Sequence, residues 1–568
     1  MKKTKEFAPA AVFSSNMVLQ RRKNINIFGE GADGDRVTVT LGGECTDTII
    51  RDGRFLAVLN PQEAADSIVL KLECYSGKSG RLKKTVVFEN VAIGEVWLCG
   101  GQSNMEFELQ NCTGGMESLK NDRNPNVRFY YTNKIAVKDS NFYEAEKNTC
   151  WNLFSSTNAK AWSAVGYYFG KKLSEDLGIT VGLIGCNWGG TSASAWMSEN
   201  ALAEDKDTKT YLDEYYDAIR GKTKEVQLKE FAEYEAFHAQ WSKKCEELYR
   251  KNPDITWDEV QEILGKCRWP GPMNCANPFR PSGLYDTMLK RVMPYTLAGF
   301  IYYQGESDDH KPLFYEKLFT RMIRNWREDW EDNKLPFLFV QLPPHRYKQD
   351  PDRKNWAYIR EAQQHVFDTV RNTQMAVIMD KGQYNDIHPK EKLTPGSRLA
   401  GLAEYSVYGM LGEKKVYGPM YDHMAIEEKD SGSIRSVKLF FRNADDGIVV
   451  KFPDSGFEYL DYDSKKVERA IKECEGDIYL EAKYSPFEIA GDDKIFFPAD
   501  MQIIGNTIKV SNNDVKRPLY VRYMFSNYGP CLLYARNGLP MAPFRTSVRD
   551  EKNILENEKK EIKQLMEL

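Results

Sequence analysis

The stretch that organises this chain is AIGEVWLCGGQSNMEF, residues 92–107. Its apolar run 96–99 has the composition of a buried strand and leads into two glycines, at which a backbone can turn sharply. Ser103 follows the glycines, and residues 105–109 can open a helix. This order places a hydroxyl at the carboxyl end of a strand, as in a nucleophile elbow. Ser103 could equally be a helix N-cap, since serine is among the best capping residues.

The composition argues against several classes of partner. With 78 basic and 82 acidic residues in 568, the formal net charge is −4, which gives no electrostatic reason to expect nucleic acid or an anionic membrane. The eleven cysteines contain no CxxC pair, and no histidine near Cys267 or Cys275 has zinc-ligand spacing, so we expect reduced thiols and no metal. Without a convincing signal peptide or spanning segment, a cytoplasmic protein is expected; a chain trimmed of its signal would look the same.

The sequence pattern changes three times along the chain. Residues 1–92 and 413–548 carry short alternating runs between turn clusters, which predict two β-sandwich-like domains. Residues 93–412 alternate strand-like and helical patterns, which predict an α/β domain with a five-stranded parallel sheet. A charged, helix-like insertion at about 199–268 would be either a rim of the site or a solvated decoration. Residues 549–568 are expected to form a charged helical tail.

The expected elements of the central region have definite positions. The strands are predicted at 95–99, 180–186, 298–303, 337–342 and 375–380. The helices are predicted at 161–177, 313–330, 356–370 and 393–408. Because the carboxyl ends of parallel strands meet at one edge of a sheet, the segments that follow these strands should come together there.

Those segments contain the groups that acyl transfer needs. Ser103 follows the first predicted strand, and Gly189 and Gly190 follow the second. Gln304 and Glu306 follow the third strand, and Asp386 and His388 follow the fifth. They would supply a nucleophile, oxyanion donors, an orienting acid and a base.

Among the histidines, His388 is the best candidate for the catalytic base. His388 follows a carboxylate and is terminated by a proline before a predicted helix, whereas His310 and His345 stay open as alternatives. A structural histidine at a helix start is the other interpretation of His388. Suitable oxyanion donors are the backbone N–H groups of Ser103 and Gly190 and the side-chain amide of Gln304, unless that amide is buried in a structural role.

The predicted substrate-binding residues are Asn104, Trp188 and Glu306. Trp188 and Trp196 flank the second loop, and aromatic faces beside polar donors suit a sugar ring. Glu306 is better suited to orienting a neighbour than to carrying a proton.

Four motifs taken together resemble the sialate O-acetylesterase family of the SGNH hydrolases. They are GQSNM at 101–105, GGTSASAW at 189–196, YYQGESD at 302–308 and DIHP at 386–389. The resemblance implies a flavodoxin-like SGNH core, no metal or other cofactor, Ser103 as nucleophile and His388 as base. Many SGNH enzymes carry the acid three positions before the histidine, where this chain has Asn385. Either Asp386 or a backbone carbonyl would then orient His388.

Three functions fit these features. The first is an esterase that removes O-acetyl groups from a sugar through an acetyl-serine intermediate. The second is an acetylxylan or related hemicellulose esterase. The third, from a different class, is a carbohydrate-binding protein whose core has lost activity. The sequence leaves the sugar and the oligomeric state open.

Overall fold

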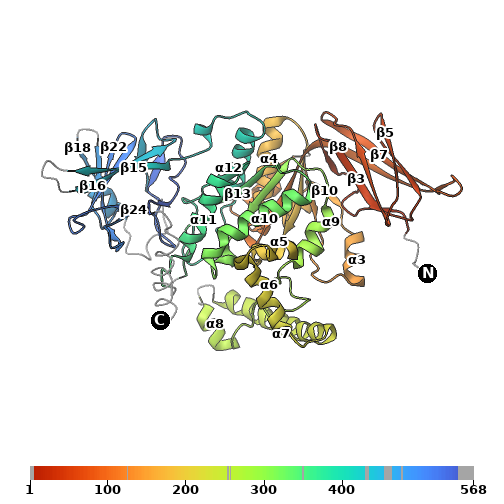
Figure 1. Ribbon diagram of the computed structural model, residues 1–568, viewed down its shortest axis with the longest axis horizontal. Helices are drawn as coiled ribbons and strands as arrows, with labels where there is room; N and C mark the ends of the chain where they lie inside the picture. The colour runs from red at the N-terminus through yellow and green to blue at the C-terminus, as the bar shows by residue number, and fades with distance from the viewer. Residues whose placement is uncertain are drawn as a thin grey trace.

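The computed structural model describes residues 6–124, 126–252, 255, 257–347, 351–428, 434–452, 464–474 and 477–547. The molecule is elongated, with β strands at both ends and an α/β region between them (Figure 1). The N-terminal strands lie at one end and the C-terminal strands at the other. The predicted tail at 549–568 lies outside the described residues.

The N-terminal strands are joined to the centre by one long strand, β8 (Leu82–Gly101). The first part of β8 pairs with β7, and its last residues pair with two central strands. Its burial changes along its length, from partly exposed to fully buried, as the sequence changes from alternating to continuously apolar. The predicted boundary at residue 92 therefore falls inside a continuous strand. The other strands here are β1 (Ala8–Pro9), β2 (Val18–Gln20), β3 (Ile25–Glu30), β4 (Arg36–Leu41), β5 (Glu44–Ile49), β6 (Arg54–Leu59) and β7 (Ala65–Tyr75).

The central part of the large mixed sheet has the order β10-β9-β11-β8-β12-β13-β14. In the described chain, six of these strands run parallel and β10 pairs antiparallel at the edge. The prediction of five parallel strands was one short because β9 was missed. Its arginine breaks the apolar pattern; Arg128 is nevertheless buried, with its guanidinium bound to the carbonyl groups of Asn16 and Asn90. The bounds are β9 (Val127–Tyr131), β10 (Trp151–Leu153), β11 (Val181–Asn187), β12 (Gly299–Tyr303), β13 (Phe337–Val340) and β14 (Thr373–Ala376).

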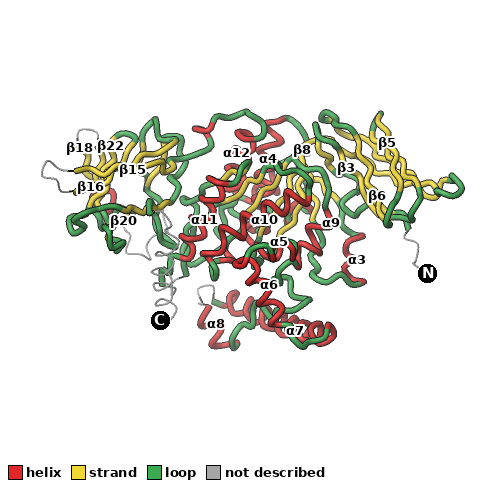
Figure 2. The backbone as a smooth tube through the Cα atoms, viewed as in Figure 1, coloured by secondary structure: helices red, strands yellow, loops and turns green. Residues whose placement is uncertain are grey.

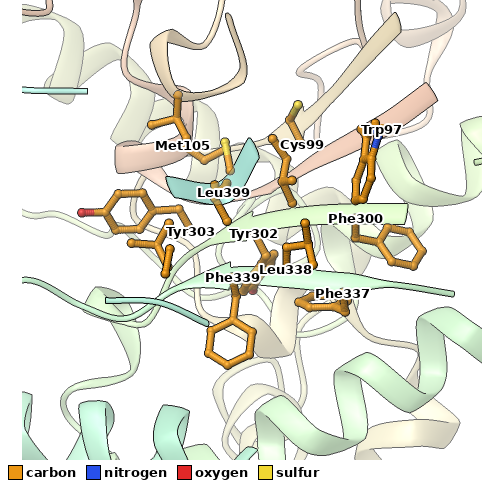
Figure 3. Close-up of a cluster of buried hydrophobic side chains, with 14 of the residues drawn as sticks. Trp97, Cys99, Met105, Phe300, Tyr302, Tyr303, Phe337, Leu338, Phe339 and Leu399 are labelled. Atoms are coloured by element: carbon orange, nitrogen blue, oxygen red, sulfur yellow. The ribbon is translucent and has the colours of Figure 1, made fainter. Parts of the chain in front are cut away.

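Helices cover both faces of this sheet. Trp97 of β8 contacts Phe169 of α4, and Phe300 of β12 contacts Trp326 of α10. Trp97 pairs with Gly299, whose neighbour Phe300 points to the opposite face, so α4 and α10 lie on opposite sides. Figure 3 shows the aromatic and aliphatic side chains packed around these strands. The four predicted helices are present as α4 (Ala164–Leu177), α10 (Tyr315–Asp329), α11 (Asn355–Thr369) and α12 (Leu393–Ser406).

The insertion is helical, as the sequence predicted. Its helices α7 and α8 form a small lobe beside the central region (Figures 1 and 2). Trp241, Cys245 and Val260 give the lobe an apolar cluster of its own. The bounds are α5 (Glu199–Ala203), α6 (Lys206–Ala218), α7 (Lys224–Lys251) and α8 (Trp257–Leu264). No helix in the described residues is long and apolar enough to cross a bilayer.

The C-terminal strands form three further sheets (Figure 2). The largest has the order β15-β16-β23-β22-β19-β18, and its neighbours are antiparallel. The principal strands are β15 (Met420–Glu428), β16 (Ile434–Arg442), β18 (Lys472–Cys474), β19 (Asp477–Leu480), β20 (Phe487–Ala490), β22 (Asp500–Ile504), β23 (Thr507–Ser511) and β24 (Tyr520–Tyr523).

Candidate active site

Ser103 stands where the sequence placed it, at the carboxyl end of β8. It opens the short helix α1 (Ser103–Glu106). The preceding turn requires glycine at 101, where φ is +132° and an added Cβ would lie 2.2 Å from the carbonyl oxygen of Tyr303. This close approach between neighbouring strands brings the hydroxyl to the edge of the sheet.

His388 reaches the serine from the loop between β14 and α12. Its Nε2 lies 2.8 Å from the hydroxyl oxygen of Ser103, within hydrogen-bond distance. Burial lowers the pKa of His388 below its ordinary value, and the neighbouring ammonium of Lys392 lowers it further. A neutral imidazole at pH 7 can accept the hydroxyl proton, so the pair has the geometry and charge of a nucleophile and its base.

Asp386 does not occupy the position predicted for a triad acid. Its Oδ1 accepts the backbone N–H of His388 at 2.9 Å. Among the described residues no hydrogen bond joins this carboxylate to the imidazole of His388. With only one residue between them, the aspartate closes a local turn on the backbone. Its negative charge still acts through space, because it raises the pKa of His388 against the larger effects of burial and Lys392.

The loop after β11 carries Gly190, one of the predicted oxyanion donors. An added Cβ at Gly189 would lie 3.2 Å from Cβ of Ser103, so the loop passes directly against the nucleophile. Gly189 donates its N–H to the carboxylate of Glu106 at 2.5 Å. Within the described chain, no acceptor is bound to the N–H groups of Ser103 and Gly190, and both are therefore available to a developing oxyanion.

Gln304 is a buried structural residue, and the oxyanion role predicted for it does not fit. Its side-chain N–H bonds go to Asp308, at 2.6 Å, and to the carbonyl of Thr191, at 3.2 Å. Its side-chain oxygen accepts from the hydroxyls of Tyr302 and Tyr315. Gln304 is 1% exposed, and both N–H groups of its amide already donate to protein acceptors. The amide therefore has no N–H group left to donate to a substrate.

Asn104 and Glu306 are also buried rather than exposed to substrate, contrary to the prediction. Asn104 donates to Oε1 of Glu306 at 2.6 Å and to the carbonyl of Ile387 at 3.0 Å, and it accepts from Nζ of Lys392 at 2.5 Å. Because Ile387 precedes His388, this side chain ties the serine segment to the histidine loop. We call Asn104, Glu306 and Lys392 the buried polar clamp.

Sequence reasoning missed Lys392, since a lysine at a helix start is usually solvated. Here it is 1% exposed, and its ammonium lies over the rings of Phe107 and Tyr303. Burial lowers its pKa to about 8, and burial raises the pKa of Glu306 to about 7. The clamp therefore carries a perturbed cation and a perturbed carboxyl directly behind the serine–histidine pair.

Of the predicted tryptophans, only Trp188 reaches the surface. Trp196 is fully buried, and its indole N–H binds the hydroxyl of Thr191. Trp188 is partly exposed, and its backbone N–H binds the carbonyl of Gly101 at 3.1 Å, which holds it close to the nucleophile turn.

A polar pocket of about 230 Å³ adjoins the histidine loop, and we call it the arginine pocket. Its lining includes Ile387, Asp309, His345, Arg346 and Arg353. Nε2 of His345 is buried without a hydrogen-bond partner, and so is Nε of Arg346. Burial lowers the pKa of His345 to about 4, so the ring is neutral at pH 7. The pocket thus places Nε of Arg346, which has no partner among the described residues, next to the loop that carries the candidate base.

The site contains no obvious metal centre. Among the described residues, no group of three or more His, Cys, Asp or Glu side chains is arranged to hold a metal ion. The ten cysteines whose side chains the structure describes are free thiols.

Comparisons with known proteins show what the chain is similar to. The family model for carbohydrate esterases described as sialic acid-specific acetylesterase matches residues 93–236 and 273–400. These matched segments, slightly less than half of the chain, make its central region similar to that family. It is 25% identical over 444 residues to sialate O-acetylesterase of Mus musculus, covering 71% of this chain and 74% of that protein. It is 26% identical over 434 residues to the Homo sapiens protein of the same name, covering 71% of each.

A solved structure shows the same overall fold. The carbohydrate acetylesterase XAC1771 from Xanthomonas citri superposes with a TM-score of 0.69 at 23% sequence identity. The match covers 95% of this chain and all of that one, so the architecture of β-sheet regions around a central α/β region is shared.

Proposed function

We propose that this protein is a serine esterase that removes O-acetyl groups from a sugar, with a sialic acid as the preferred substrate and an SGNH-type core. The observation that carries the proposal is the 2.8 Å contact between Ser103 and His388 at the carboxyl edge of the parallel sheet. The match of the central region to a carbohydrate esterase family model supports hydrolysis of carboxylic esters.

Acylation begins with proton transfer from the hydroxyl of Ser103 to Nε2 of His388. The serine oxygen forms a bond to the acetyl carbonyl carbon, and the carbonyl electron pair moves onto its oxygen. The N–H groups of Ser103 and Gly190 stabilise that oxyanion, each removable donor being worth about 3–4 kcal/mol in another enzyme. When the intermediate collapses, the bond to the sugar oxygen breaks and His388 returns its proton to that oxygen.

Deacylation reverses these roles with water. His388 takes a proton from water as the water oxygen attacks the acetyl-serine, and acetate leaves as Ser103 regains its proton. The buried polar clamp holds the two loops in register during both steps. Asp386 shapes the turn before His388 and favours the imidazolium that forms transiently, by charge rather than by a direct hydrogen bond.

The arginine pocket favours an acidic sugar over neutral xylan. Arg346 and Arg353 line the pocket together with Asp309 and Ile387, and Nε of Arg346 is buried without a hydrogen-bond partner among the described residues. A guanidinium binds a carboxylate through paired N–H donors, and a sialic acid carries such a carboxylate. Acetylated xylan, the substrate in the alternative assignment, has no comparable carboxylate to bind in the arginine pocket. An inactive binding protein is disfavoured because the serine–histidine contact is intact.

Acetate release from a panel of esters tests the proposal. The panel holds an O-acetylated sialic acid, acetylated xylan and a neutral acetylated monosaccharide, with Ser103→Ala as the inactive control. We expect the highest kcat/KM on the sialic acid, and we expect Arg346→Gln to lower it for that substrate alone. A preference for xylan that Arg346→Gln leaves unchanged would transfer the assignment to the hemicellulose alternative.

A further inference from the structure

One large aromatic side chain near the site is exposed and was not anticipated from the sequence. Trp269 is 53% exposed, and it lies on the segment that returns from the helical lobe to the central region. An added Cβ at Gly190 would lie 2.9 Å from Cζ2 of this indole and 3.0 Å from Cε1 of Phe279. The indole therefore sits directly against Gly190, whose N–H is the proposed oxyanion donor.

The segment that carries Trp269 is held in place. Asn277 is fully buried, and its side chain donates to the carbonyl groups of Pro270 and Pro272 at 3.0 and 3.1 Å. The Phe279 ring meets the indole edge-on, with centroids 5.4 Å apart. The ring of Tyr234 on α7 packs against Gly271, where an added Cβ would lie 2.5 Å away. An exposed indole fixed on its inner side presents its outer surface at little further entropic cost.

Trp269 comes from outside the part of the chain that the family shares. The matching family model ends one block at 236 and resumes at 273, so residues 237–272 are not part of it. The residue that borders Gly190 is therefore supplied by an addition to the common domain. Binding residues are disproportionately found on such variable segments, which a rigid scaffold positions.

The position of the indole determines what it can contact. A substrate whose acetyl oxygen binds the N–H of Gly190 carries its alcohol within reach of a ring that touches the same glycine. A sugar presents apolar C–H faces, and the face of an indole is their natural partner. Because Trp269 is 53% exposed, the residue does more than cover the glycine.

We propose that Trp269 stacks on the sugar ring of the substrate and makes this esterase select cyclic sugar acetates over small alkyl acetates. The inference rests on the proposed function, because it takes an O-acetylated sugar as the substrate. It adds a specificity-determining residue that lies outside the shared catalytic domain.

Substitutions that keep the bulk of the side chain provide the test. Trp269→Leu covers Gly190 with apolar volume but has no aromatic face, and Trp269→Phe restores an aromatic face. We expect the Leu variant to raise KM for the acetylated sugar about five- to tenfold with kcat within about twofold, and the Phe variant to recover most of the loss. Neither variant should change kcat/KM on ethyl acetate, which has no ring to stack.

A matched control comes from the same lobe. Tyr249 is 37% exposed and lies fifteen residues beyond Tyr234 on α7, which is about 22 Å at 1.5 Å per residue. Tyr249→Leu should leave both substrates unaffected. As a second readout, the sugar ester should bind Ser103→Ala more tightly than the Ser103→Ala, Trp269→Leu double variant in calorimetry.

The outcomes separate the inference from the proposed function. Sugar turnover that is unchanged in Trp269→Leu overturns the stacking inference alone. An equal loss on ethyl acetate also overturns it, because the residue would then act on the Gly190 loop. A wild-type enzyme that cleaves ethyl acetate but no acetylated sugar overturns the proposed function, and the stacking inference with it.

Discussion

Replacing Asn104 with alanine should disable the site and weaken the fold at the same time. The amide makes three hydrogen bonds, to Glu306, to the carbonyl of Ile387 and from Lys392. Asn104 is 0% exposed, so water cannot replace the lost partners without entering the core. The substitution also removes the side chain that connects the serine segment to the loop carrying His388.

The magnitude follows from what is left unpaired. A buried donor or acceptor without a partner costs about 1–3 kcal/mol, and a buried charge without its partner costs about 3–5 kcal/mol. Since Glu306 and Lys392 can relax partly, we expect a total loss of about 3–5 kcal/mol. For a domain of this size, each kcal/mol of lost stability lowers Tm by about 2–4 °C. The Tm of the central region should therefore fall by about 10 °C. A misplacement of the base by about 1 Å would lower kcat roughly a hundredfold.

The assay combines differential scanning calorimetry with steady-state kinetics below the transition. Asn325→Ala is the matched control, because Asn325 is 4% exposed and bonds Asp329 and the N–H of Ser198 away from the nucleophile. That control should lose stability but keep kcat within about twofold. The clamp would be refuted if Asn104→Ala melted within about 2 °C of wild type and retained its kcat.

Four further outcomes follow from the same geometry. Asp386→Asn keeps an oxygen for the N–H of His388, so kcat on an aryl acetate should fall about tenfold or less with KM unchanged; a loss of about 10⁴ would mean that the carboxylate acts on the imidazole. The acidic limb of kcat/KM should lie below pH 6.5, because burial and Lys392 lower the pKa of His388 and only the neutral ring is active. Lys392→Met removes a positive charge and should move that limb to higher pH; an unmoved limb contradicts the assigned cause. Nitrophenyl hexanoate should be cleaved at least about tenfold less efficiently than the acetate, because the loop at Gly190 lies against Ser103 and Trp269, and equal rates would indicate a general esterase.

The serine–histidine pair could be predicted because it depends on few facts. Ser103 and His388 each follow a predicted strand, and parallel strands bring their carboxyl ends together. In the structure Nε2 of His388 lies 2.8 Å from the hydroxyl oxygen of Ser103. A serine hydroxyl needs a nearby base to act as a nucleophile. The presence of both residue types at one edge of the predicted sheet therefore indicated acyl transfer.

The surroundings of the pair could not be predicted in the same way. Whether Gln304 faces substrate depends on Asp308 and Tyr315, which take up its amide only after the chain has folded. Lys392 is buried because the rings of Phe107 and Tyr303 meet over it, and no local pattern encodes that meeting. Trp269 reaches Gly190 from the far side of an insertion, a tertiary contact that sequence spacing does not reveal.

The identity of the nucleophile is tested most directly by covalent labelling. A fluorophosphonate should modify the wild-type protein once, and mass spectrometry of the digested protein should place the adduct on the peptide containing Ser103. His388→Ala, which removes the base 2.8 Å from the hydroxyl, should slow the labelling by several orders of magnitude. An adduct on another residue, or labelling that persists in Ser103→Ala, would contradict the assignment of Ser103 and His388 as nucleophile and base.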